Sequence, residues 1–151
     1  MLSTHFKNKK IALVGPSPHL LGKNHGKFID TFDLIIKINE LGVVQEMEKD
    51  YGSRTDIAFM TLSQEAVEIY SKMKEEVNFE KLKLIIHPRD EYNFNPITKR
   101  EKTMNVREYY KQLKLDIEFK HITEPTFEER CEIFKCFPGT GSLAIFEILR
   151  Y

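Results

Sequence analysis

The sequence contains no tryptophan and only two cysteines, Cys131 and Cys136. Two cysteines do not supply the disulfide framework that stabilises many small secreted domains. Their C-x4-C spacing also differs from the C-x-x-C of redox proteins and from the spacing of zinc ligands. We therefore predict two partly buried thiols with no role in catalysis or metal binding.

The sequence also lacks an excess of either sign of charge, and it lacks long apolar runs. Lys+Arg and Asp+Glu are equal at 23 each in 151 residues, so no general attraction to nucleic acid or to an anionic membrane is expected. No apolar run approaches the ~20 residues that span a bilayer, and the N-terminus lacks the apolar stretch of a signal peptide. We expect a cytoplasmic protein whose residues 1–151 form a single domain.

Strand and helix patterns alternate along most of the chain. Short apolar runs predict strands, and apolar residues at intervals of three to four predict helices. The Thr126-x-x-Glu129 segment has the form of a capping box. This alternation favours an α/β fold, with a mostly parallel sheet and helices on both faces. The predicted strands are Ile11–Val14, Leu34–Ile38, Asp56–Met60, Leu82–Ile86 and Ile117–Ile122; the predicted helices are Ser63–Glu76, Met104–Leu113 and 127–135, and Tyr92–Thr98 is turn-rich.

Two loops fall where ligands bind in such sheets, beyond the carboxyl ends of the strands. Gly15 directly follows the first predicted strand, and Asn39 directly follows the second. The segment between the two strands contains three glycines and two prolines and is longer than a usual connector. We interpret it as a ligand-binding loop.

The first loop differs from two common nucleotide-binding loops. Neither G-x-x-x-x-G-K-[ST] nor G-x-G-x-x-G is present, which argues against a nucleotide hydrolase and an ordinary NAD enzyme. Gly15 still permits close approach of the backbone to a ligand. Ser17, His19 and Asn39 offer hydrogen bonds to a phosphate or a ribose. The two loop prolines each remove one backbone donor.

A second candidate site is the PGTGS segment, Pro138–Ser142, which opens an apolar helical segment. Backbone amides, the Thr140 hydroxyl and the helix dipole converge there, which suits a phosphate or a carboxylate. A simple N-cap turn is the alternative. The helix that follows is apolar on most of its surface, so we expect it to be buried. Because neither a glycine cap nor a strand follows it, we also expect the chain to be the front part of a longer protein.

Other polar residues are interpreted as structural. The five histidines show no spacing typical of a metal site. His87 and His121 end predicted strands, where they either face the site or are hydrogen-bonded within the fold. Arg54 and Asp56 are expected to form an ion pair before the third strand. No Ser-His-Asp arrangement is indicated.

Residues 11–60 resemble the long sialyl motif of eukaryotic and viral sialyltransferases, glycosyltransferase family 29. That motif runs from an apolar strand through V-G-N-S-G-N-L, a glycine, I-D-S-x-D and a second strand ending in R-x-N to V-G-x-[RK]-T. The chain carries VGPSPHL from Val14, Gly26, IDTFD from Ile29, KIN ending at Asn39, and YGSRT from Tyr51. The segment FPGTGSLAIFEIL resembles the short sialyl motif, P-[ST]-[ST]-G followed by an apolar helix.

The resemblance implies a Rossmann-like, GT-A-like fold. It also implies metal-independent, inverting transfer of a sugar from a CMP-activated donor to a hydroxyl of a glycan acceptor, without a cofactor. By the same resemblance, the donor nucleotide would be bound by Gly15, Pro16, Ser17, His19, Asn39, Gly139, Thr140 and Gly141.

Several positions depart from the family pattern. Pro16 and His19 replace two asparagines, and Gly139 replaces a serine or threonine. Ile11 stands where animal members carry a disulfide cysteine, which is consistent with a viral or other non-animal member in a reducing compartment. The family's general base is a histidine in a later motif, beyond Tyr151, so the catalytic residue stays unassigned.

Two functions follow from these observations. The leading hypothesis is a sialyltransferase-like enzyme, truncated at its C-terminus. The alternative is a catalytically inactive nucleotide-binding or interaction module derived from such an enzyme, which the unassigned base and the loop prolines favour. A Rossmann oxidoreductase lacks support because the glycine fingerprint is missing.

Overall fold

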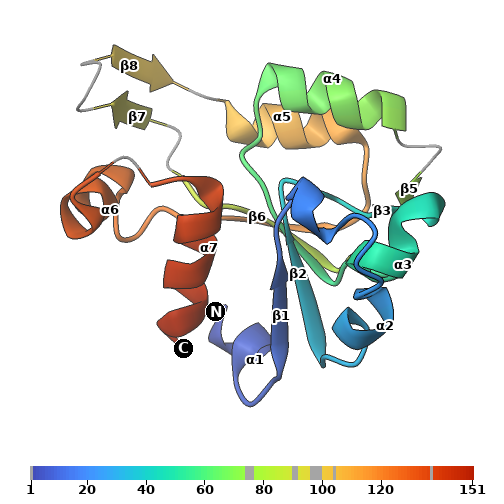
Figure 1. The fold of residues 1–151 in the computed structure, drawn as a ribbon. Coiled ribbons are helices and arrows are strands. Elements are labelled where there is room, and N and C mark those ends of the chain that lie inside the picture. Colours follow the sequence, from blue (N-terminus) through green and yellow to red (C-terminus); the bar gives the residue numbers. More distant parts are fainter. Residues whose placement is uncertain (1, 74–76, 90–91, 96–99, 104, 137) are drawn as a thin grey trace.

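The central element is a sheet of five parallel strands. The structure is a computed structural model that describes residues 2–73, 77–89, 92–95, 100–103, 105–136 and 138–151. The strands neighbour one another in space in the order in which they occur in the chain (Figure 1). They are β1 (Ile11–Val14), β2 (Leu34–Ile38), β4 (Ile57–Phe59), β6 (Leu84–His87) and β9 (Glu118–His121). The predicted parallel α/β fold is confirmed.

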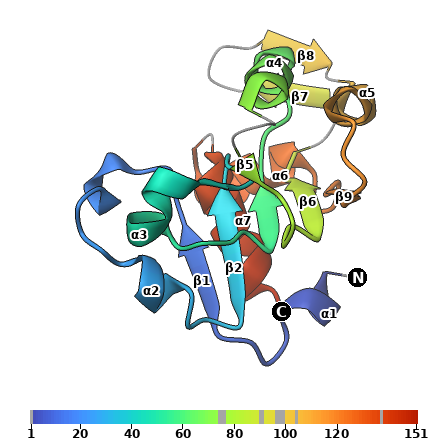
Figure 2. The ribbon, with the colours of Figure 1, turned by 90° about the vertical axis from the view of Figure 1, so that its right-hand side faces the viewer.

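Helices cover both faces of this sheet (Figures 1 and 2). On one face, α2 (Gly26–Ile29) and α3 (Glu48–Tyr51) lie over β1 and β2. On the same face, α4 (Gln64–Met73) and α5 (Val106–Leu113) cover β4 and β6. On the opposite face lie α1 (Ser3–Phe6) and α7 (Thr140–Leu149), and α6 (Phe127–Phe134) packs beside α7.

Burial on both faces explains the continuous apolar runs of the strands. In β2, Leu34 and Ile36 pack in the cluster beneath α1 and α7, while Ile35 packs beneath α2 and α3. The register aligns Ile36 with Ile57 of β4, so each face continues from strand to strand. Lys37 is the polar residue of β2, and its side chain is completely buried as well.

One predicted turn is a strand. The segment expected to be turn-rich contains β7 (Tyr92–Asn95), which pairs antiparallel with β8 (Arg100–Thr103). The turn prediction weighted the asparagines and overlooked the alternation of Tyr92 and Phe94 with them, which is a strand pattern. The remaining predicted turn residues 96–98, the helical residues 74–76 and residue 104 lie outside the described residues. Two short strands, β3 (Val43–Val44) and β5 (Val77–Asn78), form a further antiparallel pair.

Two of the predicted helix starts, those of α4 and α6, are confirmed by their capping hydrogen bonds. The Ser63 hydroxyl accepts a hydrogen bond from the Ala66 amide at 3.2 Å and caps α4. In the capping box of α6, the Thr126 hydroxyl accepts from the Glu129 amide, and the Glu129 carboxylate accepts from the Thr126 amide. These local bonds explain why both helices begin near the predicted residues.

The last helix is buried on one side only, contrary to the prediction. Ile145 is 49% exposed and Leu149 is 80% exposed, because only one face of α7 packs against the sheet. Glu147, the one acidic residue of α7, is buried instead. Its carboxylate lies 4.0 Å from Nε of the buried Arg130 of α6 and 3.2 Å from Arg150. The polar residue therefore points inward to meet a cation, and two apolar residues point outward.

The predicted ion pair and the predicted thiols can both be located. Arg54 Nε lies 3.7 Å from Asp56, and the same carboxylate accepts the Ile35 amide at 2.8 Å, which confirms the structural role expected for this pair. Both cysteines are free. Cys131 is buried in α6, but Cys136 is exposed, so the prediction of two partly buried thiols is wrong for Cys136. Within the described part of the chain, no helix combines the length and the apolar character needed to cross a membrane.

Candidate functional site

The first predicted loop leaves the sheet at the end of β1. Val14 pairs with Lys37, so Gly15 emerges beside the end of β2. The Ser17 carbonyl oxygen accepts a hydrogen bond from the Tyr51 hydroxyl of α3 at 2.6 Å. The Ser17 hydroxyl accepts the His19 amide at 3.4 Å and caps the short 3-10 helix η1 (Pro18–Leu20). The loop is therefore attached to α3 through its backbone.

A second anchor holds the far end of this loop to the same helix. The Asp50 carboxylate of α3 accepts hydrogen bonds from the Gly22 amide at 2.9 Å and the Asn24 amide at 2.8 Å. These two amides lower the pKa of the Asp50 carboxyl group. The segment from Ser17 to Asn24 is thus fixed on α3 at both ends.

Asn39 organises the end of β2. It has a left-handed backbone conformation with φ of 55°, which asparagine tolerates better than most residues. Its amide donates to the Phe59 carbonyl at 2.7 Å, and its side-chain oxygen accepts the Thr61 amide at 3.2 Å. Its carbonyl accepts a hydrogen bond from the Tyr70 hydroxyl of α4. Asn39 therefore joins the ends of β2 and β4 to α4.

The segment after β4 links this edge to the second predicted motif. The Thr61 and Thr140 hydroxyls lie 2.9 Å apart and share a hydrogen bond. Gly141 packs against the last residue of β2, where an added Cβ would lie 3.3 Å from Ile38 Cδ1. Gly139 is the N-cap of α7, and a glycine has no side chain with which to cap the helix. The first amides of α7 are therefore open to a ligand beside Asn39 and Thr61.

Three of the predicted site residues are brought together by these contacts: Asn39, Thr140 and Gly141. Gly139 is exposed at the N-terminus of α7. Gly15, Pro16, Ser17 and His19 lie on the neighbouring loop, which leaves the sheet beside Ile38. Both predicted motifs thus border the end of β2. Their contact with a ligand stays a prediction.

Three residues of this edge were missed by the sequence analysis: Thr61, Tyr51 and Tyr70. Thr61 comes two residues after β4, so the rule that selected Asn39 could have found it. No sequence signal indicates the two tyrosines, because their roles depend on where α3 and α4 pack. Burial, and to a smaller extent the nearby Glu40 carboxylate, raise the pKa of Tyr70 to about 12, so this hydroxyl keeps its proton.

His87 was predicted either to face the site or to be hydrogen-bonded within the fold, and the structure shows the second. Its side chain is completely buried, and Nδ1 accepts the Leu62 amide at 3.0 Å. Burial, with smaller contributions from the neighbouring His121 ring and Arg89, lowers the pKa of His87 to about 3. His87 therefore stays neutral and fixes the segment after β4. Among the described residues, no three His, Cys, Asp or Glu side chains are grouped as metal ligands would be.

A buried lysine and a half-buried glutamate influence each other's pKa behind this edge. Lys37 is buried on the α3 side of β2, and its Nζ has no hydrogen-bond partner among the described residues. Burial lowers the pKa of Lys37 to about 8, while Glu40, Asp30 and Glu48 act in the opposite direction. Burial also raises the pKa of Glu40, which Lys37 in turn lowers. The opposite charges of the two residues therefore partly offset the pKa shifts that burial causes in each.

Comparison with known proteins identifies one family. The sequence profile of glycosyltransferase family 29 (sialyltransferase) matches residues 3–131. The matched range contains the first predicted motif, including Gly15 and Asn39, and ends before Gly139. A search of curated proteins returned no match.

Proposed function

Because the chain belongs to glycosyltransferase family 29, the sialyltransferases, we propose that it takes part in transfer of a sugar from a CMP-activated donor to a hydroxyl of a glycan acceptor. One observation carries this proposal. Asn39, Thr61 and the open N-terminus of α7 lie together at the carboxyl edge of a parallel sheet. That edge is where nucleotides bind in α/β folds of this type.

The N-terminus of α7 would hold the phosphate of the donor. The first amides of the helix, from Thr140 to Ser142, have no acceptor within the helix, and the helix dipole favours an anion there. Asn39 accepts the Thr61 amide with its side-chain oxygen. Its NH₂ group has no partner among the described residues and can donate to the ribose or the phosphate.

The reaction that follows from this arrangement is an inverting displacement. The bond between the anomeric carbon and the phosphate oxygen breaks, and the acceptor oxygen forms its bond on the opposite face of the sugar. The electron pair of the broken bond stays on the phosphate, where α7 would stabilise the charge of the leaving CMP. The acceptor proton passes to a base, for which family resemblance supplies no residue of this chain. We propose that the transfer is metal-independent, with the helix end meeting the phosphate charge.

A second candidate function is a nucleotide-binding module without transferase activity. Pro16 stands where the family pattern has an asparagine, and it lacks a backbone donor. Such a chain would bind CMP at the same edge and leave a CMP-sugar intact.

Titration with CMP tests both functions. Calorimetry should show saturable binding, and Thr140→Val should weaken it about five- to tenfold, because the Thr61 bond that orients the helix end is lost. Thr123→Val, at an exposed site after β9, is the matched control and should bind CMP like the parent chain.

The outcomes separate the candidates. Absence of CMP binding would contradict both functions. Binding accompanied by turnover of a radiolabelled CMP-sugar supports the transferase, and binding with an intact CMP-sugar supports the module.

A further inference from the structure

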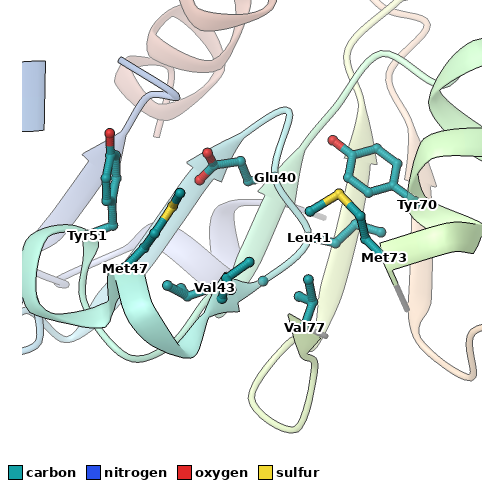
Figure 3. Close-up of a pocket in the computed structure, with 10 residues that line it drawn as sticks. Glu40, Leu41, Val43, Met47, Tyr51, Tyr70, Met73 and Val77 are labelled. Atoms are coloured by element: carbon teal, nitrogen blue, oxygen red, sulfur yellow. The ribbon is translucent and has the colours of Figure 1, made fainter. Parts of the chain in front are cut away.

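A cavity of about 210 Å³ lies between α3 and α4, next to the end of β2. Figure 3 shows side chains from the α3 region and from α4 facing each other across it, with two valines at its base. The segment before α3 is the 3-10 helix η2 (Gln45–Met47). The walls are formed by Met47 and Tyr51 on one side and by Tyr70 and Met73 on the other, above Val43 and Val77.

Among the described residues, the lining of the cavity is apolar except for the Glu40 carboxylate and the two tyrosine hydroxyls. The Glu40 carboxylate has no hydrogen-bond partner among the described residues. Both tyrosine hydroxyls already donate to backbone carbonyls, those of Ser17 and Asn39. A complete sugar inside this space would leave most of its hydroxyls without partners, which is costly. An apolar group with a hydrogen-bond donor at its edge fits better.

The cavity and the proposed donor edge share their supports. Tyr70 lines the cavity with its ring, and its hydroxyl holds the Asn39 carbonyl. Tyr51 does the same for the Ser17 carbonyl. Glu40 directly follows Asn39 in the chain. A group bound in the cavity would therefore lie beside the donor, as a transferase needs for its second substrate.

We propose that this cavity is an acceptor subsite that binds an apolar aglycone, while Glu40 accepts a hydrogen bond from a hydroxyl of the attached sugar. This inference rests on the proposed transferase function. The size of the cavity suits a single aromatic ring, since an engineered apolar cavity of roughly 150 Å³ binds benzene. The acceptor class is thus an aryl glycoside or a glycoside with a short branched apolar aglycone, rather than a bare oligosaccharide.

Methionine methyl groups report occupancy directly. In a sample labelled with ¹³C at the methionine methyls, phenyl β-glycosides of common hexoses and benzene should shift the signals of Met47 and Met73 in a saturable way. The corresponding methyl β-glycosides should leave them unchanged. Met60 is buried in the core and does not line the cavity, so its signal is the internal control.

Two variants test the proposed contacts. Met73→Ala should weaken phenyl glycoside binding on the order of tenfold, because it removes apolar wall area. Ile69→Ala is the matched control, since Ile69 lies on the same helix, is 54% exposed and does not line the cavity. Glu40→Gln should weaken phenyl glycoside binding at least threefold and leave benzene binding unchanged, because a charged acceptor hydrogen-bonds more strongly than an amide.

Donor binding is read separately, on the amide signals of Gly141 and Ser142 during CMP titration. Benzene binding without phenyl glycoside binding, or binding of neither, would overturn the acceptor subsite even if CMP binds. Unchanged affinity of Glu40→Gln for the phenyl glycoside would overturn the role of Glu40. If CMP leaves the two amides unmoved, the proposed donor site fails, whatever the methionine signals show.

Discussion

Replacement of Lys37 by methionine is expected to stabilise the protein. Lys37 lies on β2 between Val14 of β1 and Ala58 of β4, and its side chain is completely buried. Its ammonium group has lost its hydration and has no hydrogen-bond partner among the described residues. Methionine is similar in length and flexible enough to fill the same space without a charge.

The pKa shift sets the size of the effect. Burial lowers the pKa of Lys37 from 10.5 to about 8, and each pKa unit corresponds to ~1.4 kcal/mol. The charged side chain therefore costs about 3 kcal/mol at pH 7, and its removal should raise the melting temperature by about 5–10 °C. Between about pH 8 and 10.5 the folded form gives up its proton while the unfolded form keeps it. The stability of the parent chain consequently rises with pH in this window, and the advantage of Lys37→Met disappears above it.

Urea unfolding at pH 7 and at pH 10.5 measures both effects. Lys83→Met is the control, because Lys83 is exposed just before β6 and its replacement should change the stability by less than about 0.5 kcal/mol. The reasoning is refuted if Lys37→Met is less stable than the parent chain at pH 7. That result would mean that the acidic neighbours, Glu40 first, hold the ammonium more strongly than burial disfavours it.

Three further substitutions test the packing. Gly26→Ala should destabilise the fold by about 2–4 kcal/mol in urea unfolding, because its Cβ would lie 2.0 Å from a carbonyl oxygen of α3. Glu147→Gln should cost about 3–5 kcal/mol, since Arg130 loses its buried carboxylate; a loss below about 1 kcal/mol would contradict this. The low pKa of His87, about 3, predicts that stability falls from pH 6.5 towards pH 3, because only the unfolded chain takes up the proton. His87→Asn, which keeps an acceptor for the Leu62 amide, should weaken that dependence in acid titrations followed by circular dichroism.

The central strands could be predicted because local sequence and tertiary burial agree there. Ile11–Val14 is a continuous apolar run, and Leu34–Ile38 is apolar except for Lys37, as expected for parallel strands with helices on both faces. Their ends coincide with the prediction, since Gly15 and Asn39 both interrupt the run. The hairpin strand Tyr92–Asn95 was missed because it lies outside this sheet, and its asparagines resemble turn residues.

The last helix shows what composition leaves open. Its apolar residues predicted burial, but the pattern does not tell which of them meets the sheet. Glu147 is inside because Arg130 of α6 lies opposite, and Ile145 and Leu149 are outside because no described element covers them. A pairing between two helices cannot be derived from either helix alone, so the orientation of α7 needed the structure.

The sequence indicated part of the candidate site, because strand ends mark positions along the chain. Gly15 and Asn39 follow strands, and strand ends are recognisable in sequence. Thr61 could have been found by the same rule. The cavity could not, because it depends on the distance between α3 and α4 and on the directions of Met47, Tyr70 and Met73. Side chains of common type line a cavity wherever two helices leave space between them, and no sequence pattern marks such a place.

The first loop is anchored to α3 in a way that would let a CMP-sugar bind despite Pro16. Proline removes a backbone donor at a position where the family pattern offers an asparagine. The loop does not depend on that residue for its shape, because Tyr51 and Asp50 hold it from α3. The Asn39 side chain and the first amides of α7 are hydrogen-bond donors at this edge that do not depend on residue 16. Binding of a CMP donor should therefore rely on the ends of β2 and β4 more than on the loop after β1.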